Sequence, residues 1–513
     1  MRNFCLFFLL FAGFNLFGQM HVEQGEWSNH QDKGIHQGFV MSDSLHIYSI
    51  DFKNNKFRNE QRLYANVYDK QKLTLKNSFE ITPENKEGTQ LDLVQIFSVQ
   101  QTMILVMVES EIEKSIDKRI VLQIINSDGT RGKTVIADTL PSQQNVNEDF
   151  QVIVDKTETG FVICTNYPVS LEENQKLKIT AFNANLSQKW NKTIEFPNKE
   201  KQFIFSDWRY DGDQKVFFLA RHIIDLFQSE MEFTTLTHNS FFLWSFDNAK
   251  DKLKEIELSL NQRFIHKITL ELDANRWILA GIFSNDKKFH SDGVFNLILD
   301  KDAKVISHTI HNFTVEEQRL FNVFDQPKIN KKGIDEIQMK NIQLMQNGEF
   351  VLVGEEFYKE IEEPNDGRMS PTNFTEVFYY QNIALFWFES TGALKGTYSI
   401  PKNQMSINDH GMYSSFAQAQ DDSQLYFFFN DHPKNLSIDN PTGSSIKPIS
   451  SNRKTYLKGI QIDNKGVIRK KVVHAPSKSS RIQASAGAQL LDGFTYFLVQ
   501  KRRRKAILKI EFP

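Results

Sequence analysis

The stretch Trp277-Ile-Leu-Ala-Gly281 is a short apolar run in a unit that recurs about eight times along the chain. After a variable gap, a second apolar run ends at the turn formed by residues 300–302, and a third run begins beyond it. A unit of this kind is typical of a four-stranded antiparallel blade, and blades in series are typical of a β-propeller. The sequence therefore predicts an all-β propeller of about eight four-stranded blades, or seven if the first unit is divided incorrectly.

The other units supply the same signals. Their first apolar runs, which we assign as second strands, are residues 45–50, 103–108, 161–164, 216–220, 350–354, 425–429 and 494–499. Turn residues that tolerate tight or left-handed geometry follow in seven units, at Asp69 and at residues 127–129, 183–185, 247–248, 300–302, 390–392 and 463–466. The last unit ends after its third strand. We expect residues 21–27 to supply the missing fourth strand and close the ring, because closure removes exposed strand edges.

Composition agrees with one large β domain. The chain has 513 residues, of which 24% are charged and 40% hydrophobic, and 44 of them are phenylalanine. Aromatic and β-branched residues suit the half-buried surfaces by which blades stack, and stretches with helical periodicity are nearly absent. Because repeat architectures form one body at this length, we predict a single propeller domain over residues 20–513.

The first 19 residues have the features of a signal peptide. Arg2 provides a positive start, an apolar stretch covers residues 4–17, and Gly18 is a small residue before the expected cleavage point. We therefore expect export to the periplasm, the cell surface or the medium. No run approaches the roughly 20 apolar residues of a membrane helix, so no transmembrane segment is expected. The formal charge of −2 argues against nucleic acid as a partner.

Loop lengths distinguish the two faces of the predicted disc. In an antiparallel blade, the loops between second and third strands emerge on the same side as the connections between blades. Four long insertions fall in these two kinds of connection, over blades four to seven: residues 222–238, 311–335, 355–379 and 430–454. Long loops on a rigid scaffold often carry binding or catalysis, although they can also be tolerated surface additions.

One group of residues on this face suggests chemistry. Asn408-Asp409-His410 precedes the first strand of blade seven, and Asn430-Asp431-His432 follows its second strand. The hairpin between the triplets has arms of nearly equal length, so they should lie side by side, with His410 and His432 within about 10 Å given strand spacings near 4.8 Å. Two imidazoles and two carboxylates can bind a divalent metal, for which His410 and His432 are the candidate ligands, or act as an acid/base pair. Equally, Asx residues routinely cap loops.

Other side chains are weaker candidates. Tyr358 belongs to a set of insertion aromatics that can stack on sugar rings or fix the loop to the disc, and Arg368 lies in a charged loop that can meet a cation or a glycan. Residues 501–505 form a basic cluster suited to anionic polysaccharide, but short basic runs often lie at solvated hairpin tips.

Three segments resemble a family of uncharacterised exported proteins of Bacteroidetes-type bacteria. They are residues 284–295, residues 408–416 and residues 429–436, which reads Phe-Asn-Asp-His-Pro-Lys-Asn-Leu. The similarity covers mainly the second half of the chain. It implies a periplasmic or surface setting and no particular activity.

Together these features favour an exported binding or scaffold protein that engages a protein or glycan ligand through the insertion-bearing face of blades four to seven. The alternative is a metal-assisted or glycan-active hydrolase on the same face. An enzyme needs a focused pocket with a metal or perturbed carboxylates, whereas a scaffold needs only broad complementarity.

Overall fold

The structure is a computed structural model. It describes residues 20–29, 35–55, 60–84, 89–111, 117–140, 150–167, 174–196, 202–223, 241–273, 276–286, 290–321, 337–362, 375–408, 411, 413–438, 446–449, 455–475, 480–490, 492–501 and 504–512. The predicted signal peptide lies outside these residues.

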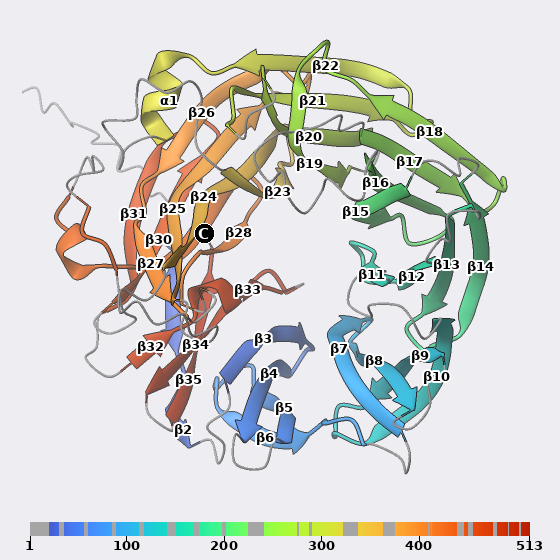
Figure 1. Cartoon of the computed structure of the whole chain (residues 1–513). Coiled ribbons are helices and arrows are strands. Elements are labelled where there is room, and N and C mark those ends of the chain that lie inside the picture. Colours follow the sequence, from blue (N-terminus) through green and yellow to red (C-terminus); the bar gives the residue numbers. More distant parts are fainter. Residues whose placement is uncertain are drawn as a thin grey trace, which may run out of the picture.

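Eight antiparallel sheets succeed one another around a ring (Figure 1). Blade one contains β3 (Ile35–Ser42), β4 (His46–Asn55), β5 (Glu60–Asp69) and β6 (Leu75–Glu80). Blade two contains β7 (Thr89–Val99), β8 (Thr102–Glu111), β9 (Lys118–Ile125) and β10 (Arg131–Leu140). Blade three contains β11 (Phe150–Val154), β12 (Gly160–Tyr167), β13 (Lys176–Asn183) and β14 (Gln188–Glu195). Blade four contains β15 (Gln202–Tyr210), β16 (Lys215–Ile223), β17 (Phe241–Asp247) and β18 (Lys252–Leu258).

The second half of the ring follows the same order. Blade five contains β19 (Phe264–Leu272), β20 (Arg276–Ser284), β21 (Gly293–Asp300) and β22 (Val305–Asn312). Blade six contains β23 (Ile337–Leu344), β24 (Phe350–Glu362), β25 (Thr375–Phe388) and β26 (Leu394–Ile400), and β27 (Gln404–Ile407) pairs with β25. Blade seven contains β28 (Ala417–Gln420), β29 (Gln424–Asp431), β30 (Tyr456–Asp463) and β31 (Ile468–His474). The predicted propeller with eight four-stranded blades is confirmed.

Blade eight is assembled from both ends of the described chain. It contains β32 (Ser480–Ile482), β34 (Thr495–Lys501) and β35 (Arg504–Glu511), with the short β33 (Ala488–Gln489) beside β34. Its outer strand is β1 (His21–Gln24), which pairs antiparallel with β35 in a register that joins His21 to Glu511. A second short strand, β2 (Ser28–Asn29), also pairs with β35. The predicted closure by residues 21–27 is therefore confirmed.

The core lies between the blades. Successive side chains of a strand point to opposite faces of its sheet, so a strand that is buried on both faces packs against both neighbouring blades. In β20, Ile278, Ala280 and Ile282 pack toward blade six, whereas Leu279 and Phe283 pack toward blade four. The same division produces eight clusters of buried apolar residues, one at each junction between consecutive blades. The cluster that joins blades eight and one completes the ring.

Part of the insertion after β22 forms a short helix. Helix α1 (Val315–Phe321) begins with a reciprocal cap in which Glu317 N donates to Thr314 Oγ1 at 3.2 Å and Thr314 N donates to the Glu317 carboxylate at 2.8 Å. Its last residue, Phe321, is buried among aromatic residues of blades five and six. In the described parts of the chain, no helix is both long enough and apolar enough to cross a membrane.

Candidate functional site

The described residues of the insertion at 355–379 extend the blade itself. Strands β24 and β25 run on as a hairpin as far as Glu362 and Thr375, and β27 adds a third strand beside β25. The rings of Tyr358 and Tyr379, which are opposite each other in the register, stack at 4.3 Å between centroids. Tyr358, the predicted ligand-stacking residue, is therefore half-buried against a neighbouring ring of its own hairpin. Cross-strand aromatic pairs of this kind stabilise a hairpin that extends past its disc.

A buried ion pair fixes the base of this hairpin. Glu355, at the point where β24 leaves the blade, is fully buried, and its Oε1 lies 2.6 Å from the ammonium of Lys402, which follows β26 and is also buried. The other carboxylate oxygen accepts a hydrogen bond from Ser415 Oγ at 2.7 Å and lies 3.1 Å from Lys340 Nζ. Burial alone would raise the pKa of Glu355, but the two ammonium groups and the hydrogen bonds hold it below the usual range.

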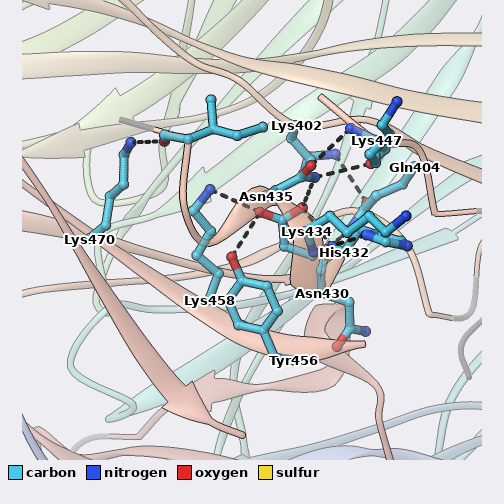
Figure 2. A network of polar contacts seen from close by, with 12 residues as sticks. Lys402, Gln404, Asn430, His432, Lys434, Asn435, Lys447, Tyr456, Lys458 and Lys470 are labelled. Carbon is cyan, nitrogen blue, oxygen red and sulfur yellow. Dashed lines mark hydrogen bonds and ion pairs between the residues drawn. The ribbon is translucent and has the colours of Figure 1, made fainter. Parts of the chain in front are cut away.

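A second network surrounds Asp431, at the end of β29 (Figure 2). Its Oδ1 accepts hydrogen bonds from His432 N at 2.8 Å and from Asn435 Nδ2 at 2.7 Å. Its Oδ2 accepts one from the Tyr456 hydroxyl at 3.1 Å and pairs with Lys458 Nζ at 2.9 Å. Burial, followed by the charge of Asp431 and its hydrogen bond, raises the pKa of Tyr456. Four donors therefore hold a carboxylate that is 3% exposed.

This network ties the blade-seven insertion to the disc. Asn435 lies in the short 3₁₀ turn Pro433–Asn435, and its amide exchanges two hydrogen bonds with the backbone of Lys447, at 3.0 and 2.9 Å. Asn430 donates to the carbonyl oxygens of Tyr413 and Ile482, which links blade seven to its neighbour. Residues 433–435 are therefore attached both to Asp431 at the end of β29 and to Lys447, a contact that the sequence alone does not predict.

Of the predicted site residues in and around blade seven, the structure describes Asp431 and His432. Asp431 serves as the hub of the network just described. His432 is half-buried, and its Nδ1 accepts a hydrogen bond from Lys434 N at 3.1 Å, which caps the 3₁₀ turn. Asp409, His410 and Arg368 lie outside the described residues, so the predicted distance between His410 and His432 stays a prediction. Within the described ranges, no three His, Cys, Asp or Glu side chains are grouped so as to hold a metal ion.

Two other segments, residues 290–293 and the basic cluster at residues 501–505, form ion pairs within the protein. In the loop between β20 and β21, His290 Nε2 lies 3.2 Å from Asp292 Oδ2, which also accepts a hydrogen bond from Asn285 N at 2.6 Å. In the basic cluster, Lys505 is buried and pairs with Asp51 of blade one. The Asp51 carboxylate lies 3.6 Å from His36 Nδ1, so three titratable groups meet at the junction where the ring closes.

Sequence reasoning missed the lysines that neutralise these carboxylates. Lys402, Lys458 and Lys505 are 1%, 7% and 1% exposed, although lysine is rarely buried unless it is paired. It also missed a repeated turn in blades one, seven and eight. There, Asp43, Asp421 and Asp492 each accept hydrogen bonds from backbone amides of the turn and from a tyrosine hydroxyl near the start of the next strand. The spacing of Asp to Tyr, four or five residues, is a signal that could have found this turn.

No protein-family model matches the chain, and none of the curated proteins matches it in sequence. Among solved structures, it is similar to a prolyl endopeptidase at 8% identity and a TM-score of 0.40, over 91% of this chain and 55% of that one. It is also similar to the β-propeller domain of the Trilobed protease from Pyrococcus furiosus, at 9% identity and a TM-score of 0.37, over 86% of this chain and 98% of that one. A Synechocystis apocarotenoid oxygenase matches at 10% identity and a TM-score of 0.32, over 66% of this chain and 69% of that one. This chain thus spans about half the length of the prolyl endopeptidase, and similarities at these identities concern the fold alone.

Proposed function

We propose that the protein is an exported binding or scaffold protein that engages a protein or glycan ligand through the insertion-bearing face of blades four to seven. The observation that carries the proposal is the three-stranded extension of β24, β25 and β27. Its strands are braced by the buried pair of Glu355 and Lys402, so it is a fixed platform raised above the disc. Binding residues placed on such a scaffold need little ordering when a ligand arrives.

The exposed surface of the platform suits a ligand with apolar faces. The register places Tyr358, Tyr379 and Met405 in one row across the three strands, all half-buried, with Ile407 on the same face and 48% exposed. On the opposite face, Ile361 is 60% exposed. Aromatic and aliphatic groups that stay partly accessible on a rigid element are typical of protein and sugar recognition.

The export part of the proposal rests on the signal-peptide features of residues 1–19 and on the resemblance to exported bacterial proteins. We accordingly place the protein in the periplasm, at the cell surface or outside the cell. Detection of the mature chain beginning near residue 20 in envelope or medium fractions, by mass spectrometry, tests this placement. A full-length chain confined to the cytoplasmic fraction would contradict it.

The test of binding is removal of the platform. Phe357 and Tyr380 are paired in the register, so replacing residues 358–379 by Asn-Gly closes the hairpin with a favoured two-residue turn and leaves Glu355 and Lys402 in place. We expect this variant to keep the wild-type melting temperature within a few degrees and to lose binding. Binding is measured by affinity electrophoresis with dextran, laminarin and xyloglucan for glycans, and by cross-linking to envelope proteins for a protein partner.

The double variant His410→Ala/His432→Ala is the matched control, and it should bind as the wild type does. Equal behaviour of the wild-type and shortened proteins in both assays would overturn the proposal. Release of reducing sugar by the wild type, lost in the histidine variant, would instead favour the hydrolase.

A further inference from the structure

Two adjoining cavities lie on the face opposite the insertions, one between blades four and five and the other bounded by blades three, four and five. The first has a volume of about 340 Å³ and the second about 460 Å³, within the range of roughly 300–1,000 Å³ that is usual for ligand sites. Lys215 and Lys301 line both cavities. Phe217 of the first cavity packs against Trp277 of the second, so a pair of aromatic rings lies between them.

The first cavity has an excess of positive charge. Its charged lining consists of five lysines and two aspartates: Lys215, Lys250, Lys252, Lys254, Lys301, Asp247 and Asp302. Asp247 is shared between Lys215, at 3.8 Å, and Lys250, at 3.6 Å. Lys254 donates to the backbone carbonyl oxygens of Asp302 and Ala303. The described part of the chain offers no ion pair to Lys252 or Lys301, and both are exposed.

The second cavity adds a buried donor. Trp277 is 3% exposed, and its indole N–H has no acceptor among the described residues. Buried donors are normally paired, because leaving them without an acceptor is costly. Trp208 and Trp244 share this property, but neither lines these cavities. Of these three tryptophans, Trp277 is the one that lines a cavity.

The other charged side chains of the second cavity already have partners within the protein. Lys156 Nζ and an Arg209 guanidinium nitrogen lie 2.6 and 3.4 Å from the Glu271 carboxylate. Asp155 and Asp211 accept hydrogen bonds from backbone amides of their own turns, and Asp273 lies 3.0 Å from Arg276 Nε. A ligand with negative groups at the first cavity and neutral hydroxyl groups, which both donate and accept hydrogen bonds, at the second would match this distribution of charge.

We propose that these cavities form a binding site for an anionic saccharide, whose sulfate or carboxylate groups lie against Lys252 and Lys301 and whose hydroxyl groups extend toward Trp277. This site is separate from the platform of β24, β25 and β27 and does not depend on it. The contact of charge with charge makes binding sensitive to salt, because exposed charges are screened within about 8–10 Å at physiological ionic strength.

The test uses dextran sulfate, with uncharged dextran of the same size as the reference probe. In isothermal titration at low salt, the wild type should bind dextran sulfate and not dextran. Charge reversal in Lys252→Glu/Lys301→Glu should weaken this binding at least tenfold. The matched control, Lys72→Glu/Lys465→Glu, makes the same change of net charge at exposed turn lysines of blades one and seven and should bind within twofold of the wild type.

Two further measurements separate a site from general attraction. Sodium sulfate should displace the probe more effectively than sodium chloride at equal ionic strength, and Trp277→Phe should weaken binding about threefold. An equal loss in the two charge-reversal variants, or equal competition by sulfate and chloride, would overturn the proposal. Melting temperatures of all variants show whether each still folds, and the salt competition needs only the wild-type protein.

Discussion

The two faces of the disc use charged side chains differently. On the insertion face, carboxylates located where strands leave the disc are buried and matched by buried ammonium groups, as in Glu355 with Lys402 and Asp431 with Lys458. On the opposite face, aspartates close tight turns through backbone amides, and lysines such as Lys252 and Lys301 remain exposed. The difference indicates that charges on the first face hold the insertions in place, whereas some charges on the second are available to a ligand.

The largest expected effect comes from breaking the pair at the base of the platform. Lys402→Ala leaves the carboxylate of Glu355 buried, with the hydrogen bond from Ser415 and with Lys340, at 3.1 Å, as its remaining counter-charge. We expect a loss of about 3–5 kcal/mol in the free energy of unfolding, as is usual when one partner of a buried pair is removed. Urea unfolding followed by circular dichroism measures it.

The double variant Glu355→Gln/Lys402→Met removes both charges and should recover at least half of that loss. On the opposite face, Lys252→Ala should change the unfolding free energy by less than about 0.5 kcal/mol. If Lys402→Ala and Lys252→Ala were equally mild, the two faces would not differ as described.

A smaller effect should follow from Asp431→Asn. The amide keeps an acceptor for two of the four donors but leaves Lys458 without its counter-charge, so we expect a loss of about 2–3 kcal/mol. Amide hydrogen exchange should rise at residues 434–438, which the network attaches to the disc. Asp128→Asn, at an exposed turn of blade two, is the control and should destabilise the protein much less than Asp431→Asn does. Unchanged exchange at residues 434–438 would show that the network does not hold the insertion.

The smallest effect concerns pH at the junction of blades eight and one. Burial lowers the pKa of His36, although Asp51 opposes this shift, and Lys505 adds to it. A buried imidazole with a lowered pKa favours folding fully above its unfolded pKa of about 6.5, and this contribution falls as pH drops below that value. Wild-type stability should therefore decline by up to about 1.4 kcal/mol per pH unit below pH 6.5 from this residue.

The variant His36→Gln should have a shallower decline between pH 5 and 6.5, measured by urea unfolding at each pH. His474, whose pKa is also lowered by burial, contributes in the same window, so His474→Gln serves as the comparison. Asp51 also has a lowered pKa, but its contribution is lost only near and below its unfolded pKa of about 3.9. An unchanged slope in His36→Gln would show that the imidazole does not titrate with unfolding.

Periodicity was enough to predict the blades but not the contacts on them. The run Trp277 to Gly281 and the turn after Asp300 signal a strand and a hairpin by local rules, and the structure places both as predicted. Lys505 illustrates the opposite case. A local reading predicts a solvated hairpin tip, yet its partner is Asp51, at the other end of the chain. For Tyr358 the sequence left two alternatives open, stacking on a ligand or packing within the protein. In the structure, the ring of Tyr379 stacks on one face of the Tyr358 ring.

The pairing of β1 with β35 has a consequence for how the chain folds. Strand β1 has no partner until β35 has been synthesised, so blade eight and the closed ring can form only after the other seven blades have been made. Contacts between residues so far apart in sequence slow folding, because a long loop must be ordered before the pairing contributes. Until blade eight forms, the apolar faces by which blades one and seven pack against it stay uncovered. A chaperone that covers these faces would favour closure of the ring within one molecule. Release of the chain before β35 is made would instead favour association with another molecule.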